Sequence, residues 1–127
     1  NVGVFWDFEN RALPLKNVRK TQEFASKTRE AVEGYGHVAT FKAYLDFHYL
    51  DSPALHSALD SAGISAINCP HNGRAEVVDD AIRDDMQHFA RGCSSPATIL
   101  LISGDRDYAR TVRDLSERGH RTVVIAP

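Results

Sequence analysis

The chain has 127 residues, of which 43% are hydrophobic and 25% are charged, as expected for one globular domain that buries its own core. Its formal net charge of −2 argues against a polybasic protein that binds nucleic acid through bulk positive charge. Nucleic acid is not excluded, because aspartates gathered at one metal site would mask basic surface elsewhere. No apolar run is long enough to span a membrane, so we expect no membrane partner.

The chain ends and the cysteines bear on the cellular setting. Asn1 lies almost directly at a predicted strand and Pro127 directly follows one, so we expect residues 1–127 to be a single domain cut from a longer protein. Cys69 and Cys93 lack metal-ligand spacing, which favours a thiol-reducing compartment. The sequence therefore indicates an intracellular location, with the cytoplasm favoured.

Hydrophobic periodicity predicts strands and helices in alternation. In chain order these are a strand at 2–6, a helix at about 14–33, a strand at 37–45, a helix at 55–62, a strand at 64–68, a helix at about 75–91, a strand at 98–102, a helix at about 107–118 and a strand at 121–126. A glycine follows each predicted helix, as is common at helix ends. The alternation implies right-handed crossovers, so the fold class is α/β, with a central, mostly parallel five-stranded sheet and helices on both faces.

Aspartates stand where predicted strands end or a following helix begins. Asp7, Asp46 and Asp105 come at or just after strands, and Asp79 and Asp80 lie early in the helix at 75–91. In a doubly wound sheet the loops at the carboxyl ends of neighbouring strands meet in one crevice. Carboxylates crowded there repel one another, and hard divalent cations relieve this repulsion through oxygen ligands. The hypothesis is an enzyme that uses Mg²⁺ or Mn²⁺ in phosphate ester chemistry, with Asp46 as a weaker candidate.

The helical period sorts the aspartates of the helix at 75–91. Its apolar stripe consists of Val78, Ile82, Met86 and Phe89. Turning by about 100° per residue sets Asp79 at one edge of this stripe and Asp85 at the other, with Asp80 and Asp84 on the far side. We therefore expect Asp79 to face the crevice and Asp84 to face water. Asp80 also suits the positive end of the helix dipole. Asp85 has more than one interpretation, since it needs a lysine or arginine partner, a backbone donor, or a supporting role near the metal.

Other polar residues near these positions have two interpretations each. Asp107 is equally suited to capping the next helix and to binding a metal. Asn10 can hold its loop or a substrate phosphate, and Ser103, followed by Gly104, lets the backbone approach a ligand closely. No two histidines have ligand spacing, although His71 lies in a loop beside the crevice. There is no glycine-rich phosphate loop and no serine or cysteine nucleophile motif.

Three motifs carry a family resemblance. Phe-Trp-Asp-Phe-Glu-Asn at 5–10, Val-Val-Asp-Asp-Ala-Ile at 77–82 and Ile-Ser-Gly-Asp-Arg-Asp-Tyr at 102–108 resemble, in this order, the NYN domains of the PIN-like nuclease superfamily. Each motif alone is weak, but three at family spacing are specific. The resemblance spans essentially the whole chain. It implies a PIN-like three-layer sandwich, a divalent metal and endoribonuclease activity.

The family's functional positions map onto this sequence residue by residue. Its three principal acidic positions fall on Asp7, Asp79 and Asp105, which the resemblance makes the catalytic residues. Further metal-site acids fall on Asp80, Asp107 and Asp46, and the asparagine of the first motif falls on Asn10. Many members place a lysine before the middle aspartate, whereas this chain offers Arg74, which can contact phosphate in a bidentate manner.

The reaction that fits the resemblance is metal-assisted hydrolysis of an RNA phosphodiester. Asn10 and Ser103 could hydrogen-bond the substrate or its waters, and Arg74 and Arg106 are candidates for flanking phosphates, with Arg110 and Arg113 as weaker ones. Single-stranded RNA is favoured over duplex, because an open crevice with few aromatics suits a flexible backbone.

Three other functions compete with this one. The first is an RNA-binding module without turnover, which sequence does not separate from an active enzyme. The second is a phosphoacceptor signalling domain, which requires a lysine near the end of the last strand, and residues 123–127 contain none. The third is a haloacid-type phosphatase, which requires a second aspartate two residues after Asp7, and this chain has Glu9 at that position.

Overall fold

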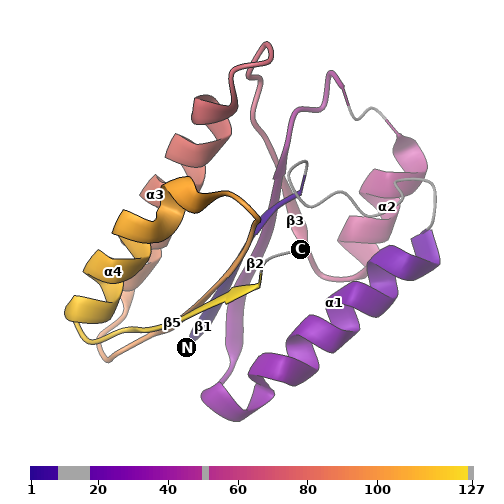
Figure 1. The fold of residues 1–127 in the computed structure, drawn as a ribbon. Coiled ribbons are helices and arrows are strands. Elements are labelled where there is room, and N and C mark those ends of the chain that lie inside the picture. The colour runs from indigo at the N-terminus through magenta and orange to yellow at the C-terminus, as the bar shows by residue number, and fades with distance from the viewer. Residues whose placement is uncertain (9–17, 50–51, 126–127) are drawn as a thin grey trace.

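Strands and helices alternate in the computed structural model, which describes residues 1–8, 18–49 and 52–125 (Figure 1). The strands and α-helices are β1 Val2–Asp7, α1 Val18–Val32, β2 Val38–Leu45, α2 Pro53–Ser61, β3 Ser65–Asn68, α3 Ala75–Gly92, β4 Thr98–Ile102, α4 Ala109–Glu117 and β5 Arg121–Ile125. Two 3₁₀ turns, η1 Glu33–Tyr35 and η2 Arg106–Tyr108, precede β2 and α4. The predicted α/β class is confirmed. The helix predicted from residue 107 differs at its start, where η2 forms before α4.

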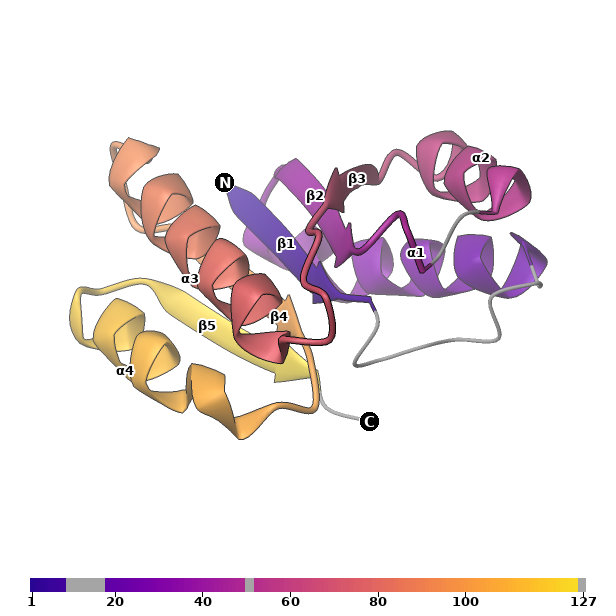
Figure 2. The same ribbon diagram turned by 90° about the horizontal axis from the view of Figure 1, so that it is seen from above.

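The sheet is entirely parallel, with strand order β3-β2-β1-β4-β5. The chain first builds outward from β1 to β3, then crosses back and builds outward from β4 to β5. Helices α1 and α2 therefore cover one face, and α3 and α4 cover the other (Figures 1 and 2). The direction of building reverses between β1 and β4, and such a switch point opens a crevice at the carboxyl ends of the two strands.

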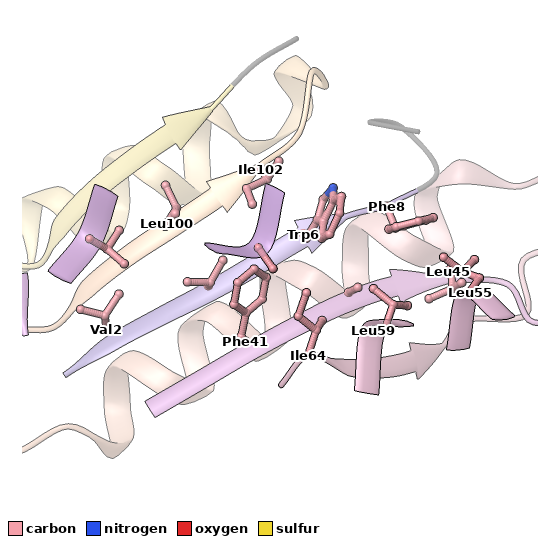
Figure 3. Packing of buried hydrophobic residues seen from close by; sticks show 14 residues of the cluster. Val2, Trp6, Phe8, Phe41, Leu45, Leu55, Leu59, Ile64, Leu100 and Ile102 are labelled. Carbon is pink, nitrogen blue, oxygen red and sulfur yellow. The ribbon is translucent and has the colours of Figure 1, made fainter. Parts of the chain in front are cut away.

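The core has two layers, one on each face of the sheet. Val4 and Trp6 of β1 belong to the layer on the side of α1 and α2, together with Phe41 of β2 and Leu59 of α2. Figure 3 shows Trp6, Phe41 and Leu59 in this layer. Phe5, which lies between Val4 and Trp6 in the sequence, joins the layer under α3 and α4. All six residues of β1 are buried, as expected for a central strand covered on both faces. None of the helices in the described part of the chain is both long and apolar enough to cross a membrane.

A close approach between α3 and β1 sets the position of the helix. A Cβ atom on Gly3 would lie 2.7 Å from the ring of Phe89, so only glycine lets this ring lie on the strand. Ten residues of helix from Asp79 to Phe89 span about 15 Å, and four residues of strand from Gly3 to Asp7 span about 13 Å. Because the helix runs antiparallel to the strand, anchoring Phe89 at the start of β1 brings Asp79 to its end.

Candidate active site

Three buried side chains form a hydrogen-bonded cluster at the switch point. Asp7 is the last residue of β1, Asp79 lies in the second turn of α3, and Tyr108 ends η2. They are 4%, 5% and 1% exposed, respectively. The Tyr108 hydroxyl lies 2.9 Å from Oδ1 of Asp79 and 3.4 Å from Oδ2 of Asp7. Since one hydroxyl has one proton, Tyr108 donates to one carboxylate at a time, and the shorter distance favours Asp79.

Tyr108 is the residue of this cluster that sequence reasoning did not single out. Burial, followed by the charge of Asp7 and the hydrogen bond to Asp79, raises the pKa of its phenol above the usual range. Tyr108 therefore stays protonated and remains a donor at physiological pH. The available signal was its place three residues after Asp105, because the hydroxyl of a buried tyrosine usually has a polar partner.

Ser103 connects β1 to the loop after β4. Its hydroxyl donates to Oδ2 of Asp7 at 3.2 Å and accepts from the backbone N–H of Asp105 at 3.1 Å. Ser103 is 2% exposed and its own N–H bonds to the carbonyl of Ile125 on β5. The serine predicted as a substrate contact is thus engaged with Asp7 and with the turn that presents Asp105.

Asp105 and Asp107 complete the acidic group. The backbone N–H of Asp107 donates to Oδ1 of Asp105 at 2.9 Å, which fixes the turn between them. Among the described residues, Asp79, Asp105 and Asp107 form a group in which one ligand atom from each lies within 4.8 Å of the others. Two oxygens bound to one Mg²⁺ at about 2.1 Å are at most about 4.2 Å apart, so this spacing fits a shared ion after a small closure or with a bridging water.

Asp79 shows the electrostatic cost of this arrangement. Burial raises the pKa of its carboxyl most, and the negative charge of Asp105 and a hydrogen bond with Asp105 raise it further. The Tyr108 hydroxyl and the Arg83 guanidinium oppose the rise without cancelling it. A divalent ion would reverse this balance, because its charge favours the ionised carboxylates.

The aspartates of α3 are arranged as the helical period predicts. Asp79 is buried, whereas Asp80 and Asp84 are exposed. Asp85 is partly buried and accepts a 2.6 Å hydrogen bond from the Tyr44 hydroxyl, with the Lys42 ammonium 3.6 Å away. The expectation that Asp85 needs a partner such as a lysine is confirmed.

Arg83 is a second residue that the sequence analysis did not single out. Its guanidinium bonds to Asp80 at 3.0 Å and to the carbonyl of Asp107 at 3.0 Å, and it lies over the ring of Tyr108. Arg83 therefore ties α3 to η2. Its spacing of one helical turn from Asp79 was the signal.

Asp46 lies at the end of β2, beyond the group of three. Its carboxylate accepts the backbone N–H of His48 at 2.8 Å and of His71 at 3.1 Å. Burial alone would raise the pKa of this carboxyl, but the two N–H groups and the nearby imidazoles outweigh it, and the pKa is lowered. In the described structure Asp46 fastens the loop after β2 to the loop before α3.

The remaining predicted contacts are only partly described. Arg74 is exposed at the N-cap position of α3, and Arg110 and Arg113 are exposed on α4. Asn10 lies outside the described residues, as does the side chain of Arg106, so their predicted roles stay predictions.

Comparisons with known proteins agree with the geometry. The profile of the NYN domain family matches residues 1–127. Relatives named meiosis regulator and mRNA stability factor 1 include the Xenopus tropicalis protein, 28% identical over 117 residues that cover 92% of this chain and 7% of the relative. The Gallus gallus protein is 27% identical over 125 residues that cover 98% of this chain and 7% of the relative. The Mus musculus protein is 27% identical over 117 residues that cover 92% of this chain and 6% of the relative.

These matches identify a domain family and cover only a small part of each relative. The chain spans about 7% of the length of the curated relatives it matches, so the similarity concerns only that part of each relative. The family profile, by contrast, covers every residue of the chain. The parallel sheet, the acidic switch point and this match all agree with the motif resemblance, and the chain belongs to the NYN domain family of the PIN-like nuclease superfamily.

Proposed function

We propose that this domain is a Mg²⁺- or Mn²⁺-dependent endoribonuclease that hydrolyses phosphodiester bonds of single-stranded RNA. The observation that carries the proposal is the convergence of Asp7, Asp79, Asp105 and Asp107 at the switch point, from three separate segments of the chain. An acidic group of this kind repels an RNA phosphate unless a cation lies between them. The site therefore suits a metal-assisted reaction on a phosphate ester.

Asp79, Asp105 and Asp107 supply hard oxygen donors at a spacing that fits one ion, and Asp7 adjoins them through Tyr108. When bound, the ion lowers the pKa of a water molecule and offsets negative charge on the scissile phosphate. Asp46 and Asp80 are the weaker candidates for metal ligands, since the carboxylate of each already accepts a hydrogen bond from the protein.

The protein's own groups hold this acidic set in position. The Tyr108 hydroxyl donates a hydrogen bond to Oδ1 of Asp79, and the Ser103 hydroxyl donates to Oδ2 of Asp7. In each carboxylate one oxygen is thus fixed by a donor, which orients the group for binding a metal. Such outer contacts typically change metal affinity or activity 10- to 100-fold when removed, as a rough guide.

Single-stranded RNA is the proposed substrate for two reasons. The relatives that match this chain are named as factors in mRNA stability. Arg74 is exposed at the start of α3, where its guanidinium can reach a flanking phosphate, and Arg106 and Asn10 are proposed on the motif alone.

Mutation of Arg74 to alanine should weaken RNA binding and reduce its salt dependence by about one charge.

The direct test is incubation of labelled single-stranded RNA and DNA with the domain, in chelator and in each divalent ion. We expect internal cleavage of RNA with Mn²⁺ or Mg²⁺ and none in chelator. Binding without cleavage under every ion would instead support an RNA-binding module that lacks turnover. Cleavage of DNA at an equal rate would contradict the choice of RNA.

A further inference from the structure

Two aromatic rings stack beside the loops that border the acidic site. Tyr49 follows β2 and His71 precedes α3, and their ring centroids are 5.4 Å apart with planes 15° from parallel. Tyr49 is 56% exposed, one of the most exposed large hydrophobic side chains in the described structure. The His48 ring also meets Tyr49, in an edge-on arrangement with ring centroids 5.4 Å apart and planes 80° apart. The three rings form a small aromatic platform, and much of Tyr49 remains in solvent.

The platform is held by hydrogen bonds at its base. The buried carboxylate of Asp46 binds the backbone N–H of His71 and of His48, the residue before Tyr49. Asn72 and Gly73 adopt left-handed conformations, with φ of 49° and 80°, and the Gly73 N–H donates to Nδ1 of His71 at 2.9 Å. The ring of His71 is therefore fixed in direction, and a ligand that stacks on Tyr49 meets a preorganised surface.

The platform lies at the same edge of the sheet as the acidic site. Asp7 pairs with Tyr44 in the sheet, and Asp46 comes two residues beyond Tyr44 at the end of the same strand. Asp79 lies four residues into α3 from Ala75, about 6 Å along the helix axis at 1.5 Å per residue. Figure 1 shows that the loop after β2 and the loop between β3 and α3 both project beyond the sheet at this edge.

We propose that the solvent-exposed part of the Tyr49 ring binds a nucleobase of single-stranded RNA by stacking, as a subsite beside the acidic site. This inference rests on the proposed function for its choice of substrate. Every base has an aromatic face, so the subsite adds affinity without reading sequence. An exposed ring beside an acidic site also has a clear use there, because the acidic group itself attracts no part of an RNA chain in the absence of a cation.

The test compares RNA with and without bases. Binding of a labelled single-stranded RNA and of an otherwise identical oligomer of abasic nucleotides is measured by fluorescence anisotropy in chelator, where no cleavage occurs. We expect Tyr49→Ala to weaken binding of the RNA about tenfold and to leave the abasic oligomer unchanged. The salt dependence should stay the same, because stacking releases no counterions.

Two variants serve as controls. Tyr49→Phe keeps the ring and should bind RNA as the wild type does. Tyr35→Ala removes another exposed tyrosine, 46% exposed, which lies just before β2 at the opposite edge of the sheet and should have no effect. An effect of Tyr35→Ala as large as that of Tyr49→Ala would contradict a local subsite.

The outcomes separate this inference from the proposed function. The stacking subsite would be overturned if the wild type bound both oligomers equally or bound neither. It would also be overturned if Tyr49→Ala bound RNA as the wild type does, even with Mn²⁺-dependent cleavage observed. A base-dependent loss in Tyr49→Ala without any cleavage by the wild type would support the subsite and overturn the nuclease.

Discussion

Asp79 and Asp46 are both buried aspartates at the carboxyl edge of the sheet, 5% and 2% exposed, yet their pKa values shift in opposite directions. Asp46 faces backbone N–H groups of two loops, which favour its charged form. Asp79 faces Asp105, and it accepts a hydrogen bond from the Tyr108 hydroxyl. Burial is common to both, so the neighbours decide the sign of the shift.

The difference indicates what each carboxylate does. Asp46 has its charge balanced by the fold and acts within the folded chain as a loop fastener. Asp79 lies in surroundings that disfavour its charge, and a bound cation would relieve this, as is typical of a group arranged for a ligand. The experiments below are designed to break this contrast, beginning with the largest expected effect.

The largest effect should come from removing charge at the acidic site. Asp79→Asn and Asp105→Asn keep side-chain size but remove a charged oxygen, and each should slow RNA cleavage about a thousandfold, since metal stabilisation is worth several kcal/mol. Asp84→Asn is the matched control, because Asp84 is exposed on the same helix. Single-turnover cleavage of labelled RNA measures all three, and an equal loss in Asp84→Asn would mean that the helix face does not select the site.

A smaller effect should come from Tyr108→Phe, which removes one hydroxyl and keeps the ring under Arg83. Without this donor the pKa of Asp79 should rise further, since the hydrogen bond from Tyr108 lowers it. We expect cleavage to fall about tenfold at neutral pH, with the loss largely recovered at higher pH or Mn²⁺ concentration. A pH-independent loss would indicate that Tyr108 acts on the substrate and not through Asp79.

Much of the fold and part of the candidate site were predictable from sequence, and the reasons for the rest are physical. The alternation of elements predicts the parallel sheet, and the positions of Asp7 and Asp105 after apolar strands place them at one edge. The helical period separates Asp79 from Asp84. These are local patterns, and each depends only on spacing along the chain.

Contacts between distant segments were not predictable in this way. Tyr108 meets Asp7 and Asp79 only because the turn after β4 folds over the start of α3. The role of Asp46 depends on two backbone N–H groups, one of them 25 residues away, which no side-chain pattern records. The start of α4 was also placed too early, since the residues from Arg106 form a 3₁₀ turn.

The metal-free stability of two variants tests the contrast directly. Asp79→Asn relieves repulsion, so the metal-free domain should melt roughly 3 °C higher than the wild type, the effect of about 1 kcal/mol at this size. Asp46→Asn should melt lower, because its amide group would face a backbone N–H that now has no acceptor. Scanning fluorimetry in chelator measures both.

Millimolar Mn²⁺ then separates ligands from loop contacts. It should raise the melting temperature of the wild type and of Asp46→Asn, by mass action on the native state, and should raise that of Asp79→Asn little. If Asp46→Asn also lost the increase, its carboxylate would belong among the metal ligands, as the family resemblance implies.

The smallest effect, and the finest test of the contrast, is the pH dependence of stability. The folded-state pKa of Asp79 is raised, so the native state holds its proton longer than the unfolded state, and the metal-free domain should lose stability as pH rises from about 4 through that pKa. Asp46 has a lowered pKa, so the stability it contributes is present above about 4 and is lost as pH falls through the lower value. Urea melts in chelator across acidic pH measure both slopes. Asp79→Asn should remove the decline in the free energy of unfolding as pH rises. Asp46→Asn should remove part of the loss of that free energy as pH falls. The same change of slope in both variants would show that the two carboxylates share one environment.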